Sequence, residues 1–157
     1  MDLAQMAGWL AAAAAIIAML KKSDLRLKQG LIIHTVLYGV HFALLGLPTA
    51  VVSCVIALAR ITLSIYTRSL LCAAALIIIS AAMALALSRS TVDILPLAAS
   101  VVLTLSLFRF DGIKLRLGLL AGSILWLIHN VYFQSWGGIC LETCFPVFSP
   151  LYRAKPR

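Results

Sequence analysis

The side chains best suited to chemistry form two matching pairs. Tyr38 and His41 lie three residues apart, and Trp126 and His129 repeat that spacing 88 residues later. Residues three apart share one face of a helix. Aromatic rings beside a few polar groups suit contact with a small planar or ring-bearing solute. A structural role fits equally well, with each histidine bonding one helix to another and the aromatic rings anchoring the outer end of the helix.

Two neighbours of these pairs differ in what they add. Asn130 directly follows His129 and supplies a further hydrogen-bond donor and acceptor. His34 shares a face with Tyr38 and His41, but Gly122 stands at the matching position of the second pair. We therefore include Asn130 among the candidate site residues and interpret His34 as a packing residue.

Two charged residues, Arg60 and Glu142, lie within apolar segments. Arg60 continues a small, polar stripe at helical spacing, which we expect to face the interior of a helix bundle: Thr49, Ser53, Ala57, Arg60 and Ser64. The positive charge of Arg60 suits contact with an anion or a carboxylate. Alternatively, the Arg60 side chain extends to the inner headgroups. Glu142 could pair with Arg60, hydrogen-bond inside the bundle as a protonated acid, or lie near the outer surface.

Sequence patterns typical of enzymes and metal sites are missing. The chain contains no HExxH, GxSxG, paired intramembrane carboxylates or Gly-rich phosphate loop. Its cysteines lack metal spacing and are interpreted as packing residues: Cys54, Cys72, Cys140 and Cys144. We therefore expect no catalytic residues, no metal and no cofactor. A haem held between His41 and His129 remains a less favoured alternative.

Composition indicates an integral membrane protein. Of 157 residues, 63% are hydrophobic and 11% charged, and the mean hydropathy is +1.07. A soluble domain has about 45–50% apolar and about 25% charged residues. The net charge of +8 sits in short clusters between apolar runs, which favours a role in membrane topology over nucleic-acid binding. We expect one transmembrane domain over 1–157, with the lipid bilayer as its surroundings.

The apolar segments predict seven transmembrane helices. A span needs roughly 20 residues, so two longer runs must be divided, at Gly46-Leu47-Pro48 and at Ser135-Trp136-Gly137-Gly138. The expected helices cover about 3–20, 30–47, 49–66, 69–88, 93–108, 117–134 and a segment from about 138. With the N-terminus outside, the inner loops 21–29, 66–69 and 109–116 and the C-terminal tail hold 11 of the 13 basic residues. This asymmetry favours an outer N-terminus and a cytoplasmic C-terminus.

Sliding the chain by 88 residues reveals a candidate internal repeat. Basic residues coincide, with Lys21 on Arg109, Arg26 on Lys114 and Lys28 on Arg116. Gly30 falls on Gly118, both histidine pairs align, and so do both helix breaks. We therefore predict an all-α fold with a 3+1+3 parallel repeat. The first repeat covers about 3–66, a linker helix about 69–88, and the second repeat about 92–154.

Several stretches resemble the YgjV family of bacterial inner-membrane proteins. They are His41-Phe42-Ala43-Leu44-Leu45-Gly46, Ala57-Leu58-Ala59-Arg60, Thr67-Arg68-Ser69, Leu95-Pro96, Leu107-Phe108-Arg109, Trp126-Leu127-Ile128-His129-Asn130, Gly137-Gly138 and Glu142. The resemblance covers nearly the whole chain and implies a multi-pass protein of the bacterial inner membrane. More distantly, the 3+1+3 plan resembles the SWEET, PQ-loop and PnuC-type carriers of small solutes.

Together these features favour a transporter or facilitator of a small solute. Parallel-repeat transporters bind their substrates at the interface of the repeats. We expect such a site to be formed by Tyr38, His41, Arg60, Trp126, His129, Asn130 and Glu142. The alternative is a non-transporting membrane assembly factor or sensor. Gly118-x-x-x-Gly122 predicts a close helix contact, either within the chain or in a homo-oligomer.

Overall fold

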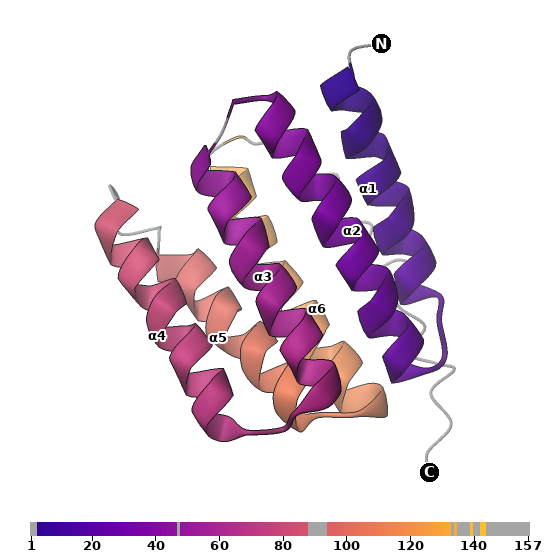
Figure 1. Cartoon of the computed structure of the whole chain (residues 1–157), viewed down its shortest axis with the longest axis vertical. Helices are drawn as coiled ribbons and strands as arrows, with labels where there is room; N and C mark the ends of the chain where they lie inside the picture. Colours follow the sequence, from indigo (N-terminus) through magenta and orange to yellow (C-terminus); the bar gives the residue numbers. More distant parts are fainter. Residues whose placement is uncertain are drawn as a thin grey trace. The chain divides into compact units, whose positions relative to one another are not determined.

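The fold is all-α. A computed structural model describes residues 3–46, 48–87 and 94–132, together with residues 134, 139, 142 and 143. This part of the chain forms six helices (Figure 1): α1 Leu3–Met19, α2 Asp24–Leu44, α3 Pro48–Tyr66, α4 Leu70–Leu87, α5 Ile94–Arg109 and α6 Gly112–Tyr132. At about 1.5 Å per residue, these helices are about 24–32 Å long, close to the thickness of a bilayer core.

The chain divides into two compact units. Unit 1, Met1–Tyr66, contains α1, α2 and α3, and α2 packs against both of the others. Figure 1 shows these three helices side by side, with the chain reversing direction at each turn. Unit 2, Thr67–Arg157, contains α4, α5 and α6, and α5 packs against both α4 and α6.

Small residues bring α1 and α2 close together. The buried residues of α1 recur at helical spacing and are mostly alanines: Ala4, Ala7, Ala11, Ala15, Ala18 and Met19. Opposite them on α2, a Cβ atom at Gly30 would lie 2.5 Å from the Ala18 Cβ and 2.9 Å from the Ala18 Cα. Only glycine fits at that distance. This close approach puts α1 backbone carbonyls within reach of α2 side chains.

A glycine and a proline divide α2 from α3, as predicted. Gly46 adopts a positive φ of 69° after the end of α2, and its N–H donates to Ala43 O at 3.1 Å. A residue in this left-handed conformation commonly ends a helix. Pro48 then begins α3, where its missing N–H costs no helical hydrogen bond.

The Gly118-x-x-x-Gly122 pattern packs α6 on α5 within one unit. A Cβ at Gly118 would overlap the Ser106 hydroxyl and lie 2.6 Å from the Ser106 Cβ. A Cβ at Gly122 would lie 2.6 Å from the Leu103 side chain. We expected this pattern to make a close helix contact either within the chain or in a homo-oligomer. The contact in the structure lies within the chain.

Two predicted boundaries were wrong for the same physical reason. We placed 21–29 and 109–116 in loops because they are rich in charge, but α2 begins at Asp24 rather than near 30 and α6 at Gly112 rather than near 117. Lysine, arginine and leucine are good helix formers, so a stretch rich in charge can be helical, with exposed side chains such as Arg26 and buried ones such as Lys28. The charged turns therefore extend the helices.

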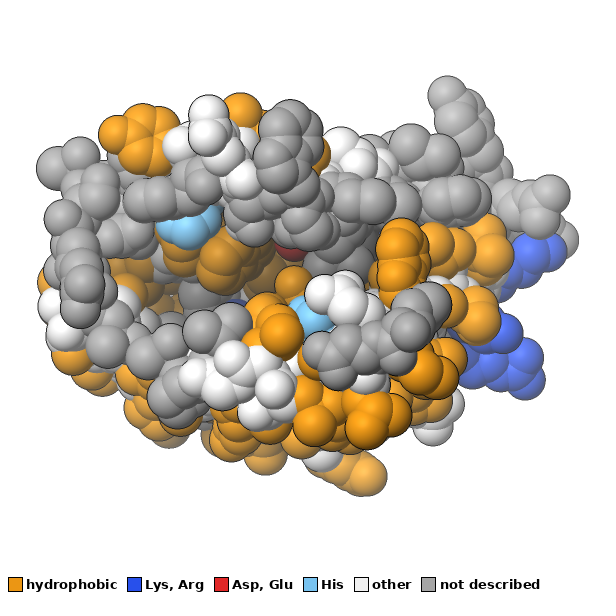
Figure 2. All heavy atoms as spheres, turned by 90° about the horizontal axis from the view of Figure 1, so that it is seen from above, with side chains coloured by type: hydrophobic (Ala, Val, Ile, Leu, Met, Phe, Trp, Pro, Cys, Tyr) orange, Lys and Arg blue, Asp and Glu red, His pale blue; other side chains and the backbone are white. Residues whose placement is uncertain are grey.

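The predicted seventh helix lies outside the described residues, except for isolated positions. Among the described helices, Gly112–Tyr132 has the length and apolarity of a membrane span, and shorter apolar helices cover Leu3–Met19, Ala50–Tyr66, Leu70–Ala86 and Ile94–Arg109. Many large apolar side chains are exposed, including Leu3, Trp9, Leu71 and Leu85. Figure 2 likewise shows hydrophobic side chains over much of the coloured surface. Lipid tails provide an apolar environment for such a surface.

Candidate functional site

His41 bonds α2 to the backbone of α1. Its Nδ1 lies 2.7 Å from Ala4 O. Because a carbonyl oxygen can only accept, Nδ1 is the donor and carries the proton. Gly8 makes room for the ring, since a Cβ there would lie 3.1 Å from His41 Nδ1. This helix-to-helix bond is the contact that the structural interpretation of His41 requires.

The predicted partner, Tyr38, lies against His41 in a row of rings along α2. The Tyr38 and His41 rings are stacked, with centroids 5.8 Å apart and an interplanar angle of 6°. On the other side, the His34 ring stacks on Tyr38 at 5.4 Å. His34 Nδ1 also lies 2.9 Å from Ala11 O, so it repeats the bond of His41 two turns away. The packing role expected for His34 thus includes a specific hydrogen bond.

In unit 2, Trp126 and His129 lie together on α6. Their ring centroids are 5.6 Å apart and the rings meet edge to face, at 83°. Both side chains are half-buried, as is Asn130. The pairing expected from the three-residue spacing is therefore present in each unit, stacked in one and edge-on in the other.

Arg60 belongs to a short buried face near the end of α3. Arg60, Ile61 and Ser64 are all buried there. Ser53 is exposed, so the expectation that the whole polar stripe faces the interior was wrong for its first half, and the side chain of Thr49 lies outside the described residues. The predicted burial of the stripe holds only towards the C-terminal end of α3.

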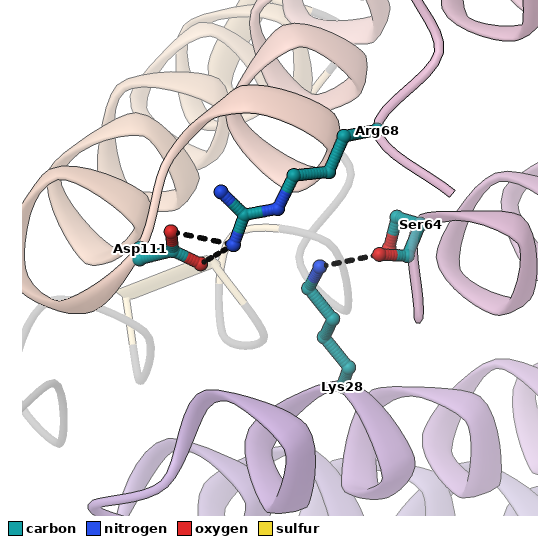
Figure 3. A network of polar contacts seen from close by, with 4 residues as sticks. All are labelled: Lys28, Ser64, Arg68 and Asp111. Atoms are coloured by element: carbon teal, nitrogen blue, oxygen red, sulfur yellow. Dashed lines mark hydrogen bonds and ion pairs between the residues drawn. The ribbon is translucent and has the colours of Figure 1, made fainter. Parts of the chain in front are cut away.

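Lys28 reaches this face from α2. Its Nζ donates to Ser64 O at 2.9 Å, and Lys28 itself is buried (Figure 3). The last carbonyls of a helix have no helical partner and carry the negative end of the helix dipole, so a lysine there is favourable. Unit 1 thus holds two buried cationic side chains, Lys28 and Arg60, on packed helices.

Glu142 accepts a hydrogen bond from α6. The Ser123 hydroxyl donates to the Glu142 carboxyl group, and Ser123 is buried while Glu142 is half-buried. The sequence left three arrangements open for Glu142. One of them, an acid hydrogen-bonded inside the bundle, requires a donor such as the Ser123 hydroxyl.

An exposed ion pair joins two turns of unit 2. Arg68 Nη2 lies 2.8 and 2.7 Å from the two carboxylate oxygens of Asp111, as Figure 3 shows. Both side chains are more than half exposed, so the pair contributes little to stability, roughly 0–1 kcal/mol.

Sequence reasoning missed Lys28 and Ser123 as site neighbours. Lys28 was grouped with loop charges, although its alignment with Arg116 in the candidate repeat singled it out. No pattern in the chain pointed to Ser123 as the partner of Glu142. Within the described residues no group of three or more His, Cys, Asp or Glu side chains is arranged to hold a metal ion. The hydrogen-bonding groups and ring faces of these residues are of the kind that can contact a small ligand.

Comparison with known proteins identifies the family. A family model named Imp-YgjV and described as bacterial inner membrane protein matches residues 2–153. The inner membrane protein YgjV of Escherichia coli K12 is 31% identical over 150 residues, which cover 91% of this chain and 82% of that protein. No solved structure matches the chain significantly. The chain belongs to the YgjV family of bacterial inner membrane proteins, as its resemblance predicted.

Proposed function

We propose that this inner membrane protein of the YgjV family is a carrier or facilitator of a small solute, built as a 3+1+3 parallel repeat of seven transmembrane helices. The observation that carries the proposal is the agreement between the two units at an offset of 88 residues. Parallel repeats of this kind form transporters whose halves rock against each other during alternating access. The proposal includes no catalytic step.

Helix bounds support the repeat. Adding 88 to the bounds of α2, Asp24–Leu44, gives 112–132, which are the bounds of α6, Gly112–Tyr132. Adding 88 to α1, Leu3–Met19, gives 91–107, which overlaps α5, Ile94–Arg109. The helix corresponding to α3 would cover 136–154, where the seventh helix is proposed.

Buried positions support the repeat more specifically, because burial depends on packing. Four positions of α2 and their counterparts on α6 are all buried: Leu27 and Leu115, Lys28 and Arg116, Leu31 and Leu119, Thr35 and Ser123. The close contact of Gly30 with Ala18 also has its counterpart in that of Gly118 with Ser106, since both members shift by 88. Chance similarity between two leucine-rich helices would not preserve such a pair.

Polar residues at paired positions support a solute site. His41 and His129 correspond at the same offset, and each lies against an aromatic ring of its own helix. Ionisable or polar residues inside a membrane are costly and commonly mark the path of a substrate. We propose that Tyr38, His41, Arg60, Trp126, His129, Asn130 and Glu142 contact the solute, and that the N-terminus lies outside and the C-terminus in the cytoplasm.

Uptake by proteoliposomes tests the function. The purified protein would be reconstituted and screened with labelled small solutes, with empty liposomes as the background. We expect His41→Ala, His129→Ala and Glu142→Gln each to lower uptake of a solute found in the screen. His34→Ala is the matched control, because His34 makes the same kind of bond as His41 but has no histidine counterpart. Undiminished uptake in all three site variants would remove the proposed site.

A further inference from the structure

Glu142 is the one glutamate in the sequence and lies in an apolar segment. Ionisable residues inside a membrane are costly, and besides substrate paths they commonly mark proton relays. The Glu142 side chain is half-buried, and the neighbouring Thr143 donates from its Oγ1 to Ile139 O at 2.8 Å, a bond typical of one helical turn. The carboxyl group therefore belongs to a helical turn inside the proposed membrane domain.

The hydrogen-bond partner of Glu142 suits both charge states of the carboxyl group. The buried Ser123 hydroxyl donates to a carboxyl oxygen of Glu142 and lies 3.4 Å from the backbone carbonyl oxygen of the same residue. A hydroxyl group has one donor and two acceptor positions, so after rotation it can accept from a protonated carboxyl group as well as donate to an ionised one. An arginine or a lysine only donates and would favour the ionised form alone.

The titratable groups on the helices packed here lie away from Ser123. Those of α6 that are buried or half-buried are Arg116, seven residues before Ser123, and His129, six residues after it. On α5, which packs on α6, the titratable group is Arg109, and it is exposed. Within the described part of unit 2, no basic side chain forms an ion pair with Glu142. The contact that the structure gives the carboxyl group is therefore the Ser123 hydroxyl.

The proposed repeat places this carboxyl group in one unit alone. At the offset of 88 residues, Ser123 corresponds to Thr35 and Glu142 to Cys54. The Thr35 hydroxyl donates to a carbonyl of its own helix at 2.8 Å. One turn after Thr35, a Cβ at Gly39 would lie 3.5 Å from the Cys54 Cβ, so α2 and α3 meet at this level. The two units share the hydroxyl position but differ in the group on the next segment, a thiol in unit 1 and a carboxyl group in unit 2.

We propose that Glu142 takes up and releases one proton, and that a proton is the ion that drives the solute. An aqueous proton bonds to a carboxylate oxygen of Glu142 while the Ser123 hydroxyl rotates to accept from it. The same O–H bond later breaks and returns the proton to water on the other side of the membrane, with no transfer of electrons. This inference rests on the proposed function, because alternating access supplies the change of side.

Infrared spectroscopy of the full-length protein in lipid bilayers measures the charge state of Glu142 without any solute. Glutamate labelled with ¹³C at its side-chain carboxyl group shifts the bands of Glu142 away from those of the aspartates, because the chain contains no second glutamate. We expect the protonated and ionised bands to interconvert within the pH range of the uptake assay, and Glu142→Gln to remove both. Ser123→Ala should change the pH of interconversion, and an unchanged pH would exclude Ser123 as the partner.

Uptake into proteoliposomes measures the coupling. With a solute found in the screen, we expect an inward proton gradient to raise the rate of uptake severalfold in the wild type. Glu142→Gln should lose this response, because its amide takes up no proton. Asp111→Asn is the matched control, since it makes the same exchange of acid for amide at an exposed position of the same unit and should keep the wild-type response.

Three results would overturn the inference: a Glu142 carboxyl group that keeps one charge state across the pH range, uptake that the gradient does not stimulate, or a response of Glu142→Gln equal to that of the wild type. The spectrum of the wild type requires no variant, so it decides even if a variant does not fold. Interconversion of the bands without uptake of any solute leaves the proton site and removes the carrier. Uptake with Glu142 in a fixed charge state leaves the carrier and removes the proton site.

Discussion

The contact between Gly118 and Ser106 yields a quantitative prediction. Gly118→Ala would place a Cβ atom over the Ser106 hydroxyl and 2.6 Å from the Ser106 Cβ. Overpacking of a well-packed contact costs about 1–3 kcal/mol, while alanine in place of glycine in a helix returns about 0.5–1 kcal/mol. Because the overlap is severe, we expect a net loss of about 2 kcal/mol in the free energy of unfolding.

A second substitution tests whether this loss is steric. Ser106→Gly removes both clashing atoms and leaves only the Ser106 Cα, at 3.7 Å, an ordinary contact. The double variant should therefore return to within about 1 kcal/mol of the wild type, the remainder being the cost of the new glycine. At the matching pair, Gly30→Ala should be rescued less well by Ala18→Gly, because the Ala18 Cα at 2.9 Å still clashes.

Reversible unfolding in detergent, followed by fluorescence or circular dichroism, measures these differences. Gly39→Ala is the control on α2, since its new Cβ would lie 3.5 Å from the Cys54 Cβ, with no clash. We expect it to be neutral or slightly stabilising. If Gly118→Ala and Gly30→Ala are as stable as Gly39→Ala, the close helix contacts, and with them the packing argument for the repeat, are refuted.

Two further contacts give smaller effects. A double-mutant cycle on Arg68 and Asp111 should give a coupling of roughly 0–1 kcal/mol that fades at high salt, because both side chains are exposed; a larger, salt-independent coupling would contradict this. Ser123→Ala should lower the free energy of unfolding by about 0.6 kcal/mol, and by at most about 1.7, through the lost bond to Glu142. Glu142→Gln keeps an acceptor and should cost less, so an equal or greater loss would argue against the bond.

The positions of the helices followed from hydropathy and breaking residues. The division at Gly46 and Pro48 was predictable because each residue has a specific backbone requirement there. The starts of α2 and α6 were not, since charge density does not distinguish a loop from the charged first turns of a helix. Arg26 and Lys28 both lie within α2.

Contacts within one helix were predictable among the candidate residues, whereas contacts between helices were not. Helical spacing brought Tyr38 beside His41, because that proximity is local. The bond of His41 to Ala4 O depends on the distance between two helices, which the small residues of α1 determine only once the pairing of α1 with α2 is known. The bond of Ser123 to Glu142 joins residues 19 apart in the chain and depends on tertiary structure in the same way.

The hydrogen bond of His41 also reconciles the two interpretations of this residue. Nδ1 donates to Ala4 O, so in the neutral ring Nε2 carries the lone pair and is an acceptor. One nitrogen holds α2 on α1, and the other has the chemistry to receive a donor from a solute. A structural role and a binding role for His41 can therefore be separated by atom.

Two substitutions separate them. His41→Asn places an amide donor near the position of Nδ1 and removes the Nε2 acceptor, so stability should stay near the wild type while uptake falls. His41→Gln places its amide near Nε2 and loses the bond to Ala4, so stability should fall by about 0.6–1.7 kcal/mol while part of the uptake remains. If uptake instead follows stability in both variants, His41 acts only by joining α1 to α2, because a solute contact at Nε2 would make the two measurements diverge.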